Sequence, residues 1–236
     1  MRHISGAKFR LFHGAALRSA RVKWLLHELL GDEFEVQSID TYEAEQYRPE
    51  YLAINPNHAV PTLQIVWPDG ETINMIESAA MIALLADTFP EAGLAPASQR
   101  LTRDRADYLQ ILHFGATIDW MLWQIRLHAH VLPDLEKDTR AVRRYERKFA
   151  DEVEPQLMQR LMKANYVCGK SFSAADCVIA HGVAWARAYG LCGQHQFADY
   201  LATMATRPAY QRAFADAGSF VLEVPRDKPV VNLVTG

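Results

Sequence analysis

The first ninety residues alternate between the two-residue hydrophobic period of strands and the longer period of amphipathic helices. Alternating or short β-branched runs between turn residues predict strands over Lys8–His13 and Glu33–Asp40 and a hairpin over Val60–Ile76. Apolar positions three and four residues apart predict helices over Ser19–Leu30 and Glu77–Pro90. With a short irregular helix before the hairpin, the order β-α-β-α-β-β-α indicates a small mixed sheet with helices on its faces.

Beyond a connector rich in proline, glycine and alanine at 90–98, the pattern becomes entirely helical. Four segments carry the helical period: Arg103–His130, Thr139–Ala164, Gln196–Ala205 and Pro208–Ala217. We expect the second to be interrupted or bent near Pro155, because proline removes a helical hydrogen bond. Ser173 and Asp176 form a capping-box pattern that opens another helix, so apolar that it must be central. The chain therefore predicts an α/β domain followed by an all-helical domain.

Composition and charge exclude several classes of partner. The 236 residues are 50% hydrophobic, which is enough for a substantial core. Formal net charge is −3 and the basic residues are dispersed, so we expect no nucleic acid partner. Neither a membrane-spanning run nor the apolar core of a signal peptide is visible, so we expect no membrane association and a cytoplasmic location. Cys168, Cys177 and Cys192 lack metal-ligand spacing, so we expect no metal.

Two short motifs flank the predicted hairpin. Pro61 stands directly before a strand that should be buried, where its missing N–H is tolerated only at the first residue or at an edge. The turn either frees backbone groups of Val60 for a ligand or is a plain edge-strand proline. Glu77 and Ser78 open the following helix, where free N–H groups attract a carboxylate. Both residue types are also common near helix starts, so a capping role stays open.

Four motifs, taken in this order and spacing, resemble those of the cytosolic glutathione transferase family in its bacterial form: Val60-Pro61, Glu77-Ser78, FSAAD at 172–176 and RPAYQRAFAD at 207–216. The resemblance implies a thioredoxin-like domain over 1–88, a linker at 89–98, an all-helical domain over 99–222 and an extended tail over 223–236. It also implies a ligand cleft between the two domains and a two-fold homodimer.

The resemblance further implies glutathione as a co-substrate. Pro61 would be cis, and the N–H and C=O of Val60 would then pair with the cysteinyl part of the tripeptide. The start of the helix at Ser78 would bind the γ-glutamyl carboxylate, and Glu77 would interact with the ligand's ammonium group.

The glycine end of glutathione would lie near Gln46 and His58. Members of the family often carry a lysine or glutamine directly before the Val-Pro pair, whereas Ala59 stands there in this chain. His58 either compensates for the missing contact or is an exposed loop histidine.

The group that should activate the thiol is not of a usual type. The family uses a tyrosine, serine or cysteine near the end of the first strand, and these positions fall on Phe12, on Ala16 and on or beside Arg18. Ser19 and Arg18 remain as candidates, through a hydroxyl, a positive charge and the adjacent helix start. Ser19 can equally be the cap of the helix, and Arg18 a solvated surface residue.

A small hydrophobic electrophile would lie against the first long helix of the second domain. Tyr108, Leu112 and Trp120 are the candidate contacts, although an aromatic stripe at helical spacing also suits a core. The implied function is transfer of the glutathione thiolate to such an electrophile. The alternatives are a non-catalytic relative that serves protein–protein contacts, and a glutathione-dependent lyase, peroxidase or isomerase.

The C-terminal tail contains apolar residues that a free chain end does not need. We expect it to fold over the helical domain toward the cleft mouth and to narrow electrophile access. The residues expected to pack are Val230, Val231, Leu233 and Val234.

Overall fold

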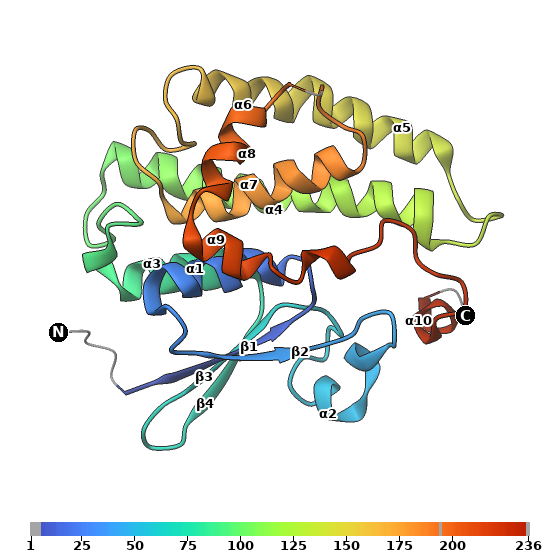
Figure 1. Cartoon of the computed structure of the whole chain (residues 1–236), viewed down its shortest axis with the longest axis horizontal. Coiled ribbons are helices and arrows are strands. Elements are labelled where there is room, and N and C mark those ends of the chain that lie inside the picture. Colours follow the sequence, from blue (N-terminus) through green and yellow to red (C-terminus); the bar gives the residue numbers. More distant parts are fainter. Residues whose placement is uncertain (1–5, 194, 235–236) are drawn as a thin grey trace.

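The first domain is built on a four-stranded mixed sheet (Figure 1). The computed structural model describes residues 6–193 and 195–234. The strands are β1 (Lys8–His13), β2 (Glu35–Ser38), β3 (Thr62–Val66) and β4 (Thr72–Met75), in the spatial order β2-β1-β3-β4. β1 is parallel to β2 and antiparallel to β3, which pairs antiparallel with β4. Phe12 lies opposite Thr62, and Leu63 opposite Met75. The ends of β1 and β4 and the start of β3 therefore meet at one end of the sheet.

Helices cover both faces of this sheet. α1 (Ser19–Leu30) and α3 (Ser78–Thr88) lie between the sheet and the helical domain (Figure 1). Side chains alternate along β1: Leu11 joins the main core, and Phe12 packs on the opposite face against Tyr51, with ring centroids 5.5 Å apart. Tyr51 belongs to the short helix α2 (Pro49–Leu52), which follows the 3₁₀ turn η1 (Glu45–Tyr47). The predicted order β-α-β-α-β-β-α is confirmed.

The second domain consists of helices. They are α4 (Arg103–Arg126), α5 (Thr139–Lys148), α6 (Glu154–Leu161), α7 (Ala174–Ala188), α8 (Ala198–Ala205), α9 (Pro208–Ala213) and α10 (Pro229–Val234). α7 is central and packs against both α4 and α1. Its capping box is confirmed, because the side chain of Asp176 accepts a hydrogen bond from the N–H of Ser173 at 2.8 Å. This cap fixes where the central helix begins.

The two longest predicted helices are interrupted by wider turns. A π-helical turn, η4 (Phe149–Val153), separates α5 from α6, directly before Pro155. Proline has no N–H for the carbonyl four residues earlier, so the regular hydrogen-bond ladder cannot continue there. α4 likewise ends at Arg126 and continues as the π-helical turn η3 (Leu127–Val131). The interruption expected near Pro155 is thus present as a π-helical turn, through which the chain stays helical.

The tail is not extended throughout, because α10 lies within it. Pro229 occupies the first helical position, where its fixed φ and missing N–H are compatible with a helix. Val230 is buried, Val231 is half-buried and Leu233 is exposed, while the side chain of Val234 lies outside the described part. The segment crosses from the helical domain to the neighbourhood of α2 (Figure 1).

Candidate functional site

The loop that joins β1 to α1 carries unpaired backbone donors at the end of the sheet where β3 begins. Ala16 has a φ of 55°, a left-handed conformation that is uncommon outside glycine. The N–H groups without a hydrogen-bond partner among the described residues are those of Ala15, Ala16, Arg18 and Ser19. Together with the positive end of the α1 dipole, these donors suit a negatively charged atom.

Ser19 does not present its hydroxyl to this loop surface. Its side chain is fully buried, and Oγ both accepts from the N–H of Gly14 and donates to the Gly14 carbonyl, each at 3.0 Å. Ser19 is the first residue of α1, and the capping position belongs to Arg18. The chain turns back so tightly after β1 that the hydroxyl meets Gly14 instead of a ligand, which corrects both roles considered for its side chain.

Arg18 is exposed and lies near two carboxylates from other elements. Glu77, at the start of α3, and Asp119 of α4 are both within electrostatic reach of its guanidinium. Arg18 therefore lies where the β1–α1 loop, α3 and the helical domain meet.

The turn before β3 leaves Val60 without backbone partners. The Val60–Pro61 bond is cis, as the resemblance implies. No turn or loop hydrogen bond in the described chain involves the N–H or C=O of Val60, and the residue stands outside the sheet ladder. The turn itself is held by the Tyr51 hydroxyl and the Asn55 side-chain amide, which donate to the Ala59 carbonyl at 2.6 and 2.8 Å.

The start of α3 is uncapped. Glu77 occupies the cap position with a φ of 71°, and its side chain makes no capping hydrogen bond. Ser78 is buried as the first helical residue, and Glu77 is exposed. The capping interpretation of this pair is therefore wrong, and the first N–H groups of α3 stay available to an acceptor.

Gln46 and His58 lie at the same side of the turn. The buried side chain of Gln46 donates from Nε2 to the Thr41 carbonyl at 3.2 Å, and its Oε1 has no partner among the described residues. His58 is exposed and stacks on Tyr47, with ring centroids 4.6 Å apart. One amide oxygen and one exposed imidazole thus border this end.

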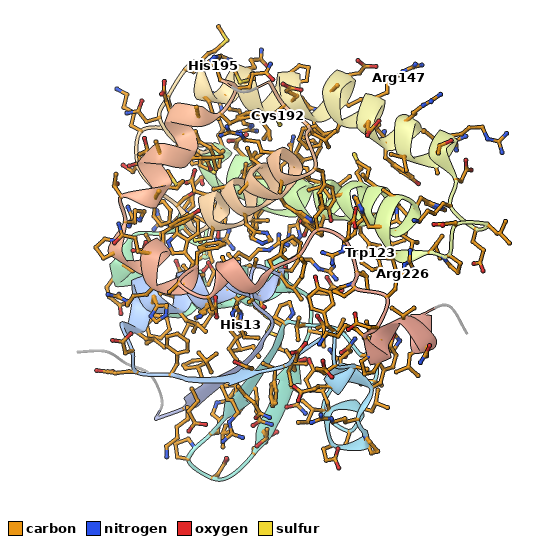
Figure 2. All side chains as sticks on the ribbon, turned by 45° about the vertical axis from the view of Figure 1, so that its right-hand side comes forward. His13, Trp123, Arg147, Cys192, His195 and Arg226 are labelled. Atoms are coloured by element: carbon orange, nitrogen blue, oxygen red, sulfur yellow. The ribbon has the colours of Figure 1, made fainter. Side chains whose placement is uncertain are left out.

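The expected aromatic wall is not assembled on α4. Tyr108 and Leu112 are fully buried in the core, whereas Trp120 is 59% exposed. Helical spacing could not decide which face of α4 meets α7 and which meets the first domain. Asp119, Trp123 and Arg126, spaced four and seven residues apart, share one face. Figure 2 shows Trp123 and Arg226 on the side of the molecule where the tail crosses from α4.

Two polar contacts at the domain boundary were missed by sequence reasoning. Arg21 of α1 has no exposed side-chain surface, and its Nη2 lies 2.5 Å from Oδ2 of Asp119. The only signal was an arginine four residues before Leu25, on the apolar face of a predicted helix.

The second contact is a junction of Arg126, Tyr42 and Val221. The Tyr42 hydroxyl donates to the Val221 carbonyl at 2.7 Å, and Arg126 donates to that hydroxyl at 3.0 Å. The guanidinium carbon of Arg126 also lies 4.8 Å from the centroid of the Phe220 ring. The segment directly before the tail is therefore tied to α4 and to the first domain.

A thioredoxin-like sheet domain followed by a helical domain, with open backbone donors at the boundary, defines the glutathione transferase fold. Residues 18–88 match the family of glutathione S-transferase N-terminal domains. The glutathione S-transferase GstA of Escherichia coli O157:H7 is 26% identical over 199 residues, covering 80% of this chain and 89% of the relative.

Solved structures agree with the fold over most of the chain. A sphingomonad glutathione S-transferase complexed with glutathione superposes with a TM-score of 0.73 at 24% identity, covering 89% of this chain and 100% of that one. Glutathione transferase URE2P6 of Phanerochaete chrysosporium, in complex with oxidized glutathione, gives 0.75 at 25% identity, with coverages of 92% and 99%. Residues 18–88 therefore form a glutathione S-transferase N-terminal domain, and the described chain has the glutathione S-transferase fold.

The described part of the chain carries neither a membrane-spanning helix nor a cluster of metal-ligating side chains. No described helix is long and apolar enough to cross a membrane. No three His, Cys, Asp or Glu side chains among the described residues are grouped to hold a metal ion.

Proposed function

We propose that the protein binds glutathione at the end of the sheet where β1 stops and β3 begins, and transfers its thiolate to a small hydrophobic electrophile. One observation carries the proposal: three uncommitted backbone sites meet there. They are the N–H and C=O of Val60, the uncapped start of α3 and the open N–H groups before α1. A tripeptide with a carboxylate, an internal amide and a thiol can satisfy all three.

Each part of glutathione has a matching group. The cysteinyl backbone pairs with Val60 beside Pro61, as an added antiparallel segment. The γ-glutamyl carboxylate accepts hydrogen bonds from Ser78 and the start of α3, and Glu77 pairs with the ammonium group. Gln46 and His58 border the glycine end.

The thiol then lies against the β1–α1 loop. A free thiol has a pKa of about 8.5, so neutral-pH chemistry needs its thiolate stabilised. The backbone N–H groups of Arg18 and Ser19, the positive end of α1 and the Arg18 guanidinium all favour the anion. The thiol releases its proton to solvent, and sulfur attacks an electrophilic carbon of the second substrate. A carbon–sulfur bond forms, and the leaving group departs with the electron pair.

Exchange chemistry through a protein cysteine does not suit this chain. No cysteine precedes Cys168 in the sequence. Burial raises the pKa of the Cys168 thiol to about 12, which suppresses the nucleophilic thiolate. Conjugation therefore accounts for the site better than a mixed disulfide.

A second candidate is a non-catalytic member that binds glutathione or protein partners without turnover. The observation that favours it concerns two described residues at the end of β1 and the start of α1: Phe12 packs against Tyr51, and the Ser19 side chain is buried. A lyase, peroxidase or isomerase reaction would use the same thiolate with a different second substrate.

Retention on immobilised glutathione and a thermal shift with free glutathione test the binding step. Ser78→Ala should weaken affinity about tenfold, because it removes a hydrogen bond to a charged group. Thr88→Ala, at the other end of α3, is the matched control and should leave affinity unchanged. A wild-type protein with neither retention nor a shift would refute the proposed function. Binding without turnover on a panel of electrophiles would leave the non-catalytic candidate.

We also propose a two-fold homodimer. Large apolar side chains are exposed on both domains, with Ile73 and Leu84 on the first and Trp120 on the second, and pairing of the two surfaces would cover them. Sedimentation at micromolar concentration should give twice the mass of one chain, and a monomer would refute this.

A further inference from the structure

Side chains from outside the Gly14–Arg18 loop hold three of its carbonyl groups, and the first of them is that of Gly14, which accepts from the Ser19 hydroxyl. Nε of Arg21 donates to the Arg18 carbonyl at 3.2 Å, and the same guanidinium pairs with Asp119 of α4. Nε2 of His181, on the central helix α7, lies 2.9 Å from the carbonyl oxygen of Ala16. The helical domain therefore reaches across the domain boundary to the loop that bears the open N–H groups.

The His181 ring is held in one orientation. The residue is only 3% exposed, its ring stacks on Phe214 with centroids 6.0 Å apart, and the Trp185 ring lies 6.1 Å away. Because the residue lies in the interior of α7, its backbone is fixed as well. A rigid donor is thus aimed at one loop atom.

The hydrogen bond also fixes the tautomer of His181. A carbonyl oxygen can only accept, so Nε2 carries the proton and donates to Ala16. Burial lowers the pKa of His181 to about 3, so the ring is neutral at any pH suited to catalysis. Its Nδ1 is then unprotonated and has no partner among the described residues. The imidazole is therefore a constant neutral donor rather than a proton carrier.

We propose that His181 is a positioning residue for the thiol end of the glutathione site, a role that rests on the function proposed above. His181 acts through the Ala16 carbonyl and contacts no substrate. With this carbonyl fixed, Ala16 keeps its left-handed φ of 55° and the following N–H groups point in one direction before glutathione arrives. Without it, the residue relaxes toward the right-handed region that alanine prefers, and the donors turn away from sulfur.

Loss of the hydrogen bond from His181 to Ala16 should raise the thiol pKa of bound glutathione and leave the affinity for glutathione nearly unchanged. In His181→Phe, which fills the space but donates nothing, we expect the pKa of bound glutathione to rise by about one unit, a tenfold loss of thiolate. kcat at neutral pH should fall about tenfold, while KM for glutathione changes less than about twofold, because Val60 and the start of α3 are untouched. Ultraviolet absorbance of the thiolate against pH measures the thiol pKa, and steady-state kinetics measure kcat and KM.

Conservative and matched variants separate positioning from packing. His181→Gln places an amide N–H near the position of Nε2 and should restore most of the thiolate pKa. Val183→Ala removes fully buried volume from the same helix, so it should lower stability without moving that pKa. If His181→Phe does not fold, His181→Asn, whose amide is too short to reach Ala16, takes its place with the same expected rise.

The outcomes separate this inference from the proposed function. Wild-type protein that fails to bind glutathione overturns both. Wild-type protein that lowers the thiol pKa, with a folded His181→Phe or His181→Asn variant that lowers it equally, overturns the positioning role alone. An equal rise in Val183→Ala also overturns it, because loss of packing would then be the cause.

Discussion

Replacing Asp119 by leucine should leave the guanidinium of Arg21 buried without its counter-charge. The Arg21 side chain has no exposed surface, and that of Asp119 is 6% exposed, so water cannot replace the lost partner. After the change, Arg21 keeps only the Arg18 carbonyl as an acceptor at 3.2 Å. Removing one partner of a buried pair costs about 3–5 kcal/mol, and we expect a loss of this size.

The double variant Arg21→Met with Asp119→Leu supplies the sharper test. Replacing both members of a buried pair by apolar residues is often neutral, so its unfolding free energy should lie within about 2 kcal/mol of the wild type. Each single variant should lie about 3–5 kcal/mol below, which for a chain of this size is a fall in Tm of roughly 10 °C. The single losses therefore should not add.

Chemical denaturation of the four proteins closes this double-mutant cycle. Asp107→Ala is the matched control, since its pair with Arg160 is 47% and 24% exposed and should contribute about 1 kcal/mol or less. If the double variant loses the sum of the two single losses, the pair is not coupled and the reasoning from burial is wrong.

Three further outcomes follow from the packing, the tail and the buried histidine. Gly115→Ala should lose about 1–3 kcal/mol of unfolding free energy, because the new Cβ would lie 2.3 Å from Cγ1 of Val178. Gly182→Ala is the control, since its Cβ would meet only Cγ2 of Ile118 at 3.5 Å. Equal stabilities of the two variants would contradict this prediction. Deletion after Val224 removes α10 and the Val230 N–H that donates to the Tyr42 carbonyl, so turnover of bulky electrophiles should rise relative to small ones. An unchanged ratio would argue against a lid. Burial lowers the pKa of His181 to about 3 in the folded protein from 6.5 in the unfolded chain, so the His181 contribution to stability is full above pH 6.5 and falls as pH drops toward 3. Between pH 6.5 and 5 the unfolding free energy of the wild type should fall by about 2 kcal/mol more than that of His181→Phe. Parallel plots of unfolding free energy against pH would be inconsistent with a buried neutral His181.

Much of the fold was predictable because its signals are local. The capping box at Ser173 and Asp176, the hairpin and the helix starts each depend on residues within one or two turns of each other. The wider turns before Pro155 and after Arg126 were less visible. A pattern of apolar residues reports which face is buried and not which hydrogen bond is skipped.

In the candidate site, too, residues in contiguous motifs could be predicted from the sequence, and contacts between distant residues could not. Val60 and Glu77 could be proposed from the sequence because their motifs are contiguous, and in the described chain the Val60 backbone and the Glu77 side chain make no turn or capping hydrogen bond. Tyr108 and Leu112 were misplaced because helical spacing cannot tell the face toward α7 from the face toward the first domain, whereas the exposed Trp120 stays a prediction. The Arg21–Asp119 and His181–Ala16 contacts join residues about 100 to 165 positions apart, and one sequence carries no signal for such pairs.

The proposed activation of the thiol by backbone N–H groups changes which residues the chemistry depends on. Where a side-chain hydroxyl activates the thiol, the activation depends mainly on the residue that carries the hydroxyl. Replacing that residue is then the main way to lose thiolate formation. A group of backbone N–H donors has no side chain to replace, and its direction depends on whatever holds the adjacent carbonyls. In this chain those holders are the side chains of Ser19, Arg21 and His181, which are buried and which the proposed function places in contact with no substrate. Substitutions that weaken thiolate formation should therefore fall in the scaffold under the loop, at positions that look like ordinary core.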